Sequence, residues 1–346
     1  MSELRLDPVT NEWVIIAPER GVRPHEGSDT EKIPTGGEVK KKDEKEGERL
    51  EKRCPFCPGD EENTGLELER INDEDGKWLV RVVCNKYPNL RPEGTVLRRR
   101  EGIFAGMDGY GRAEVVIESP IHEQNMAQMS ENHILQIFRV YKLRYLAALK
   151  DEKINLITIF RNKGNKAGAS LMHPHSQIIS QPIVPKHIRQ KIQASVEYYD
   201  NEGECIFCRV MEEEKKAGKR MVLETEYFSA FCPWASKYPY EILILPKRHN
   251  SAFSSINDRE ISDIAGLLKR LLNVFCTLLK DPDYNLIIHS APREEDPAAY
   301  YHWHIAILPR IATTAGFEIG SGTYVSIVSP ETAAAKLSEV YRNLYS

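Results

Sequence analysis

The chain has 346 residues, enough for about two domains or two similar halves that each bury a core, and a net charge of −4 without one long basic tract. This charge pattern argues against a nucleic-acid-binding protein, and the lack of any apolar run of about 18 residues argues against a membrane-spanning helix. The first residues do not form a basic-then-apolar signal segment, so we expect a cytoplasmic protein.

The first distinctive segment, Gly27–Arg53, is dominated by Lys, Glu, Asp and Gly. A segment with so few apolar side chains buries little surface, so we expect a mobile loop without a binding role. Two Cys-x-x-Cys pairs follow, Cys54/Cys57 and Cys205/Cys208, while three other cysteines stand singly in apolar stretches. In a reducing compartment such pairs indicate metal ligands or redox sites, and the single cysteines are typical of small core residues.

The first Cys-x-x-Cys pair opens a series of predicted elements. A strand-like run, Ala113–Ile117, leads to Ser119-Pro-Ile-His122. A helical pattern then covers about residues 131–149, followed by an apolar strand, Asn155–Phe160. The series ends in His173-Pro-His175.

The same series recurs after the second pair. The run Tyr240–Leu245 leads to Pro246-Lys-Arg-His249, a helix is expected over about residues 258–279, and the strand Asn285–Ile288 precedes His302-Trp-His304. Matched spacing of the two series indicates an internal duplication. We therefore predict an α+β fold with antiparallel sheets, built from two halves at residues 1–195 and 196–346.

Each half offers the ligands of a structural zinc site. Zinc in such sites takes four Cys or His ligands in a tetrahedron, and a Cys-x-x-Cys turn supplies two of them. A thioredoxin-like redox motif would need a βαβ context, which neither pair has. We predict one site from Cys54, Cys57, His122 and His173 and a second from Cys205, Cys208, His249 and His302, each cross-linking distant segments.

The run His173-Pro-His175-Ser-Gln177 indicates the chemical centre, because residues two apart on a strand share a face. The imidazole of His175 is a good nucleophile toward phosphorus and a fair leaving group afterwards. The amide of Gln177 is suited to donate to the phosphoryl oxygens without titrating. The preceding Gly168-Ala-Ser170 run allows backbone N–H groups to approach a phosphate closely.

The second His-x-His pair differs from the first. His302-Trp-His304 is followed by Ile305-Ala306, so no polar residue stands at the position equivalent to Gln177. It also lacks a Gly/Ser approach loop. We expect the second half to be structural, with His304 either an extra metal ligand or a buried polar group.

The run Asn162-Lys-Gly164…Gly168-Ala-Ser170…His173-Pro-His-Ser-Gln177 resembles the active-site signature of the galactose-1-phosphate uridylyltransferases, a family of the histidine-triad superfamily. The resemblance extends over nearly the whole chain. It includes the opening Asp7-Pro-Val-Thr10, the zinc motifs around Cys54–Cys57 and Glu118–His122, and the turn Cys84–Pro88.

The resemblance implies two repeated histidine-triad-like halves that share a large antiparallel sheet with flanking helices, in a homodimer. It implies ping-pong chemistry in which His175 takes the uridylyl group from UDP-glucose, releases glucose 1-phosphate, and passes the group to galactose 1-phosphate to give UDP-galactose. It implies catalytic roles for His175, Gln177 and Ser170 and two zinc ions per chain, with iron possible in the second site. The positions that match nucleotide, phosphate or sugar contacts are Arg20, Arg23, Asn85, Lys86, Asn162, Gly168, Ala169, Ser170, Gln177, Phe317 and Glu318.

A sister branch leaves the substrate open. The stretch Gly316–Tyr324 is more similar to the plant-type ADP-glucose phosphorylases, which transfer an adenylyl group to phosphate, whereas Pro174 departs from the serine of that branch. The alternatives are therefore uridylyl transfer to galactose 1-phosphate and adenylyl transfer to phosphate. A non-catalytic, zinc-stabilised nucleotide-binding protein is the alternative from another class, but it does not account for His175 beside Gln177.

Overall fold

The computed structural model describes residues 2–22, 54–293 and 299–345. The predicted loop Gly27–Arg53 and the predicted nucleotide contact Arg23 lie outside the described residues. Among the helices of the described ranges, none combines the length and the apolar character needed to cross a membrane.

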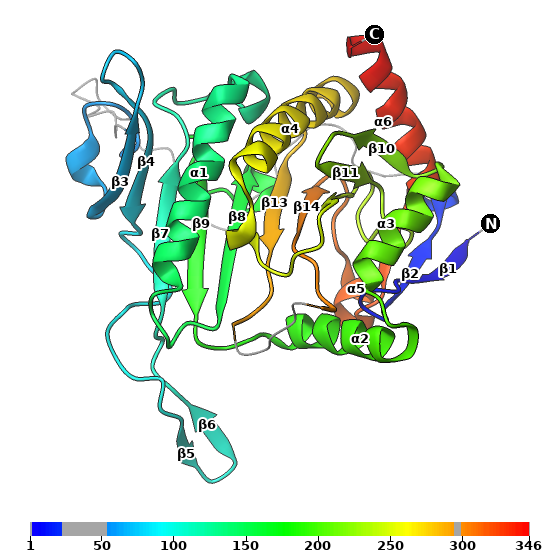
Figure 1. Ribbon diagram of the computed structural model, residues 1–346, viewed down its shortest axis with the longest axis horizontal. Coiled ribbons are helices and arrows are strands. Elements are labelled where there is room, and N and C mark those ends of the chain that lie inside the picture. The colour runs from blue at the N-terminus through cyan, green and yellow to red at the C-terminus, as the bar shows by residue number, and fades with distance from the viewer. Residues whose placement is uncertain (1, 23–53, 294–298, 346) are drawn as a thin grey trace, which may run out of the picture.

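A ten-stranded sheet, antiparallel throughout, forms the centre of the molecule (Figure 1). The first half of the chain contributes β3 (Glu67–Asn72), β4 (Trp78–Cys84), β7 (Arg112–Ile117), β8 (Leu156–Lys163) and β9 (His175–Gln181). The second half contributes β10 (Met221–Glu224), β11 (Phe228–Phe231), β12 (Ile242–Pro246), β13 (Tyr284–His289) and β14 (His304–Pro309). The predicted α+β fold with a large shared antiparallel sheet is confirmed.

The strand order is β10-β11-β12-β14-β13-β8-β9-β7-β4-β3, and it is symmetric about its central pair. Reading outward from the central pair β8 and β13, each half places its strands in the same order. The pair is joined in antiparallel register, for example Leu286 opposite Arg161. The duplication read from the sequence therefore becomes two equivalent five-stranded units. The division at residues 195/196 stays a prediction, and it falls within a helix, α2 (Lys186–Glu202).

Helices and short strands complete the described chain. The α-helices are α1 (Glu131–Ala148), α2, α3 (Ile206–Ala217), α4 (Asp258–Leu279), α5 (Gly316–Ser321) and α6 (Pro330–Tyr345). A small sheet at the chain ends consists of β1 (Glu3–Leu6), β2 (Trp13–Ile16) and β15 (Tyr324–Ser326), and a separate hairpin consists of β5 (Arg99–Glu101) and β6 (Phe104–Gly106).

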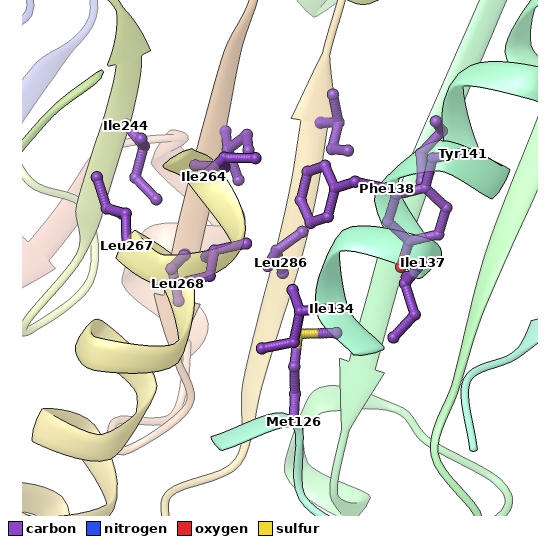
Figure 2. Packing of buried hydrophobic residues seen from close by; sticks show 14 of the residues in the cluster. Met126, Ile134, Ile137, Phe138, Tyr141, Ile244, Ile264, Leu267, Leu268 and Leu286 are labelled. Atoms are coloured by element: carbon purple, nitrogen blue, oxygen red, sulfur yellow. The ribbon is translucent and has the colours of Figure 1, made fainter. Parts of the chain in front are cut away.

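The equivalent helices α1 and α4 cover one face of the sheet (Figure 1). Ser130 accepts a hydrogen bond from the His133 N–H at the start of α1, and Asn257 and Glu260 form a capping box at the start of α4. Figure 2 shows side chains of both helices meeting those of β12 and β13 in one apolar layer, including Ile137, Phe138, Ile244, Ile264, Leu267, Leu268 and Leu286. This layer leaves the opposite face of each half available for other contacts.

A buried ion pair in the first half is linked by a hydrogen bond to the second half. The Arg161 Nε donates to Glu118 Oε2 at 2.7 Å, and its guanidinium also donates to the Tyr284 hydroxyl at 2.8 Å. Glu118 and Arg161 are both buried. Burial alone lowers the pKa of Arg161, but the neighbouring Glu118 carboxylate outweighs it and raises that pKa above its ordinary value, so the guanidinium stays charged.

The same carboxylate residue fixes the strand that carries the predicted nucleophile. The Glu118 N–H donates to the Pro174 carbonyl at 3.0 Å. The Tyr141 hydroxyl of α1 lies 3.1 Å from Glu118 Oε1 and 2.8 Å from Ser176 Oγ. Pro174 and Ser176, the two neighbours of His175, are therefore both held by this buried network.

Glu118→Gln should lower the free energy of unfolding by about 3–5 kcal/mol, because the buried Arg161 charge loses its carboxylate partner. Equilibrium denaturation of the purified protein measures this loss. Glu213→Gln, which breaks the exposed pair with Arg209, is the matched control and should have a much smaller effect. Equal losses for the two variants would contradict a structural role for the buried pair.

Candidate active site and metal centres

The first predicted metal cluster forms as expected. Cys54, Cys57, His122 and His173 each offer a ligand atom, and these atoms all lie within 4.8 Å of one another. The Cys57 Sγ lies 3.3 Å from His122 Nδ1 and 3.7 Å from His173 Nδ1. The His173 Nε2 donates to the Ser119 carbonyl at 2.7 Å, which leaves Nδ1 as the ligand atom and orients the ring.

The second cluster repeats this arrangement with Cys205, Cys208, His249 and His302. The Cys208 Sγ lies 3.3 Å from His249 Nδ1 and 3.4 Å from His302 Nδ1. The thiolate is the form of a cysteine side chain that binds a metal ion. Two thiolates and two imidazoles at this spacing fit a tetrahedral ion, so both clusters can hold a metal.

His175 is the first residue of β9 and is 8% exposed. Its Nδ1–H donates to the His173 carbonyl at 2.8 Å, because a carbonyl oxygen can only accept. This hydrogen bond fixes the neutral tautomer, in which Nε2 carries the lone pair. The ring of Phe56, from the Cys-x-x-Cys turn, packs edge-on against His175 with ring centroids 5.5 Å apart. The Cys54–Cys57 turn therefore supplies two ligands of the metal site and also packs against the predicted nucleophile.

A cavity of about 270 Å³ lies over this end of the sheet. The predicted site residues that line it are Asn85, Lys86, Ser170, His175 and Gln177. The Gln177 amide is half-buried, and no residue in the described ranges hydrogen-bonds to it. Its donor is thus available to a ligand beside His175, on the same face of β9.

Three predicted contacts of the approach loop do not line this cavity, namely Asn162, Gly168 and Ala169. The Asn162 Oδ1 accepts from Asn285 at 2.8 Å, and the Ala169 N–H donates to the Gly164 carbonyl at 3.1 Å. Gly164 has φ +84°, and a Cβ there would lie 1.8 Å from the Asp283 carboxylate. Only glycine fits this position, so the loop is held in a fixed shape that presents Ser170 to the cavity.

Arg20, Phe317 and Glu318 line a different cavity, of about 660 Å³, that shares no lining residue with the first. They come from the segment after β2 and from α5, which Figure 1 shows on the opposite side of β13 and β14 from β7 and β9. The Glu318 carboxylate accepts the Ala315 N–H at 3.0 Å. One chain therefore does not bring these three residues to His175.

Sequence reasoning missed part of the cavity wall. Phe56, Asn63, Thr64, Gly65 and Tyr87 also line it. A Cβ on Gly65 would lie 2.1 Å from the Cys84 carbonyl oxygen, so this glycine permits the close approach of two backbone segments. The exposed Tyr87, next to Asn85 and Lys86, had a signal in the sequence, because an aromatic ring beside polar turn residues is typical of a ligand-contacting surface.

Cys54→Ser should remove one metal ion per chain, because it deletes one of four ligands and the site cross-links distant segments. We expect the variant to lower the stability of the first half more than it lowers the activity of the site. Elemental analysis of unchelated protein should find close to two ions per wild-type chain and close to one in the variant. Cys276→Ser, away from both clusters, is the control and should keep both ions; metal-free wild-type protein would reject the assignment.

The similarity to known proteins extends over nearly the whole chain. Residues 1–185 match the model of the galactose-1-phosphate uridyl transferase N-terminal domain, and residues 191–344 match that of its C-terminal domain. An ADP-glucose phosphorylase of Arabidopsis thaliana is 36% identical, with 98% of this chain and 93% of that protein aligned. A galactose-1-phosphate uridylyltransferase of Thermotoga maritima is 31% identical, with 98% of each chain aligned.

Solved structures give the same result. An Arabidopsis thaliana ADP-glucose phosphorylase with bound ADP-glucose superposes with a TM-score of 0.82 at 34% identity, covering 98% of this chain and 99% of that one. A uridylyltransferase superposes with a TM-score of 0.74 at 29% identity, with both chains fully covered. Together with the two domain matches, these similarities show that the chain belongs to the galactose-1-phosphate uridyl transferase family, a family of nucleotidyltransferases.

Proposed function

We propose that this protein transfers a nucleoside monophosphate between phosphate-bearing substrates through a covalent bond to His175. The observation that carries the proposal is the His175 tautomer. Its Nδ1–H is held by the His173 carbonyl, so the Nε2 lone pair is the nucleophile at a cavity that also presents Gln177.

The chemistry has two displacements at phosphorus. In the first, Nε2 of His175 forms a bond to the α-phosphorus of UDP-glucose, and the bond from that phosphorus to the bridging oxygen breaks to release glucose 1-phosphate. In the second, a phosphate oxygen of galactose 1-phosphate attacks the same phosphorus. The P–N bond then breaks, UDP-galactose leaves and neutral His175 is regenerated. Gln177 and Ser170 donate to the non-bridging oxygens, whose charge shifts in both steps.

For the substrates, we propose UDP-glucose and galactose 1-phosphate, as in the uridylyltransferases of the family, with Pro174 supporting this choice. A second candidate, adenylyl transfer from ADP-glucose to phosphate, is supported by the 36% identity to the plant ADP-glucose phosphorylase and by the TM-score of 0.82 to its ADP-glucose-bound structure. Both candidates use the same His175 chemistry and differ in the base and the acceptor.

We propose zinc for both clusters, because two thiolates and two imidazoles are its typical structural ligands. Neither ion takes part in the displacement. The first ion would hold the Cys54–Cys57 turn, and with it Phe56, against His175. Cytoplasmic location stays a prediction.

His175→Gly should abolish turnover and the covalent step, because no other group supplies the bond to phosphorus. Incubation of the wild-type protein with UDP-glucose labelled in its α-phosphate should leave acid-labile label on the protein, and the variant should show none. Added imidazole should restore consumption of the nucleotide sugar in the variant, because the deleted ring leaves a cavity of its own size. Label retained on the variant would place the nucleophile elsewhere.

Two comparisons sharpen this experiment. His304→Gly is the matched control from the second half and should still accumulate label. Replacing UDP-glucose with labelled ADP-glucose, and galactose 1-phosphate with phosphate, decides between the two candidates. Higher kcat/KM for the adenine pair would favour the phosphorylase and reject the uridylyltransferase.

We also propose a homodimer that shares its active sites. Arg20, Phe317 and Glu318 match family positions for substrate contact, yet they line a cavity separate from that of His175. Two copies related by a two-fold axis can place the Glu318 cavity of one chain against the partner's His175. Each of the two sites then takes its nucleophile from one chain and its sugar contacts from the other.

Mixing two inactive variants should therefore restore activity. We expect His175→Gly mixed with the double variant Phe317→Ala, Glu318→Gln to recover about a quarter of wild-type activity after subunit exchange, since about half of the dimers are mixed and one of their two sites is intact. His175→Gly mixed with Gln177→Ala should recover none, because both residues line the same cavity. Equal behaviour of the two mixtures would argue against shared sites.

A further inference from the structure

An asparagine of the second half contacts the loop that leads to the first-half active site. Asn285 on β13 is buried, and its Nδ2 donates to the Ala167 carbonyl at 2.9 Å and to Asn162 Oδ1 at 2.8 Å. Its Oδ1 accepts from the Arg310 Nε. A carbonyl can only accept and a guanidinium can only donate, so these two partners fix which end of the Asn285 amide is the oxygen.

This orientation is passed on to the side chain of Asn162. Because Asn285 presents an N–H group there, the Asn162 oxygen faces Asn285 and its Nδ2 faces away. No residue in the described part of the chain accepts a hydrogen bond from that Nδ2. Asn162 therefore offers a neutral donor whose direction is set by the second half of the chain.

Asn162 lies on the face of the sheet that carries the predicted nucleophile. Phe160 and Gln177 are opposite each other on β8 and β9, and opposed residues of an antiparallel pair point to the same face. Side chains two apart on a strand share a face, so Asn162 is on this face together with Gln177 and His175. Continued by one residue beyond the last pair, the same register sets Asn162 opposite His175. The Cβ atoms of facing residues are on the order of 5 Å apart, so a donor here is next to the ring that would carry the nucleotidyl group.

The second half lacks this asparagine pair at the equivalent place. The equivalent strands β8 and β13 run side by side in the middle of the sheet, and Phe160 opposite Ile287 is the centre of their symmetry (Figure 1). Two residues to one side of that centre the facing residues are Asn162 and Asn285, and two residues to the other side they are Thr158 and His289. The sheet therefore accepts other side chains in this place, and the asparagine pair occurs only in the half that carries the predicted nucleophile.

The turn before β13 also holds the loop that runs from β8 to Ser170. The Lys166 N–H donates to Asp283 Oδ2 at 2.8 Å, and the Asp283 carboxylate fills the space beside Gly164. Together with the Asn285 contact, these interactions anchor the first-half loop on the second half. Asn285 is the member of this set that also contacts a side chain on the face of the nucleophile.

We propose that Asn285 is a positioning residue for nucleotidyl transfer, because it holds the Asn162 amide so that its N–H group donates to the phosphate oxygens while phosphorus is bonded to His175. This role rests on the proposed function. Asn162 does not line the cavity in front of His175, so its hydrogen bond to the phosphate forms as the phosphorus moves onto the ring. Asn285 does not line that cavity either, and it acts through Asn162.

Asn285→Asp should slow transfer about tenfold to a hundredfold, because the introduced carboxylate still accepts from Arg310 but cannot donate to Asn162. The Asn162 amide then turns, and its oxygen faces the phosphate. The rate at which His175 takes up label from UDP-glucose, or from ADP-glucose, measures this loss, and we expect kcat to fall while KM changes little. Thr158→Val, at the equivalent place of the sheet, is the matched control and should take up label at the wild-type rate.

Two further variants separate this role from a merely structural one. Asn285→Ala removes the amide without burying a charge, should also slow labelling, and serves if Asn285→Asp does not fold. In an Asn162→Ala background, Asn285→Asp should cost about twofold at most, because its effect passes through Asn162. Labelling at the wild-type rate in both Asn285 variants, or losses that multiply in the double variant, would overturn this role of Asn285 and leave the proposed function intact. Wild-type protein that takes up no label would overturn both.

Discussion

The buried contact between Glu118 and Arg161 is the interaction on which the site depends. It ties the segment after β7 to β8, and through Tyr284 it ties the first half to the second. Tyr141 extends the same network to Ser176, next to His175. Such a pair is costly to desolvate, so it is kept only where each charge is fully hydrogen-bonded. Here these hydrogen bonds hold the strand of the proposed nucleophile, β9, to α1 and to the segment after β7.

The two metal clusters lie beside the ends of strands, the first at β7 and β9 and the second at β12 and β14. Each joins a Cys-x-x-Cys turn to a histidine after one strand and to the first histidine of a His-x-His pair. A metal bound there would fix the backbone carbonyl of His173, and that carbonyl sets the tautomer of His175. A metal bound by the first cluster would thereby be coupled to the proposed nucleophile through His173 and His175.

The two duplicated halves share one backbone arrangement but differ in the side chains around His175 and His304. Behind His175 lies the polar Tyr141–Ser176 contact, whereas the position equivalent to Ser176 in the second half is Ile305, which is buried in the apolar core. Trp303, in the place of Pro174, packs there against Phe228 and Phe253. In front, Gln177 in one half corresponds to Ala306 in the other. The shared sheet order therefore constrains where ligands meet the protein, while single residues decide what chemistry follows.

The sequence by itself determined the local features. Period and spacing located α1, α4, the strands around them, the duplication and both four-ligand clusters, because these depend on residues close in sequence or on ligands with strict chemical preferences. The His-x-His-x-Gln alternation likewise placed His175 and Gln177 on one face. Only the tertiary structure decided which ring nitrogen faces the cavity, that Phe56 and Gly65 build its wall, and that Glu318 lies at another cavity. Those facts depend on the order of ten strands and on contacts between residues far apart in sequence, which no local pattern encodes.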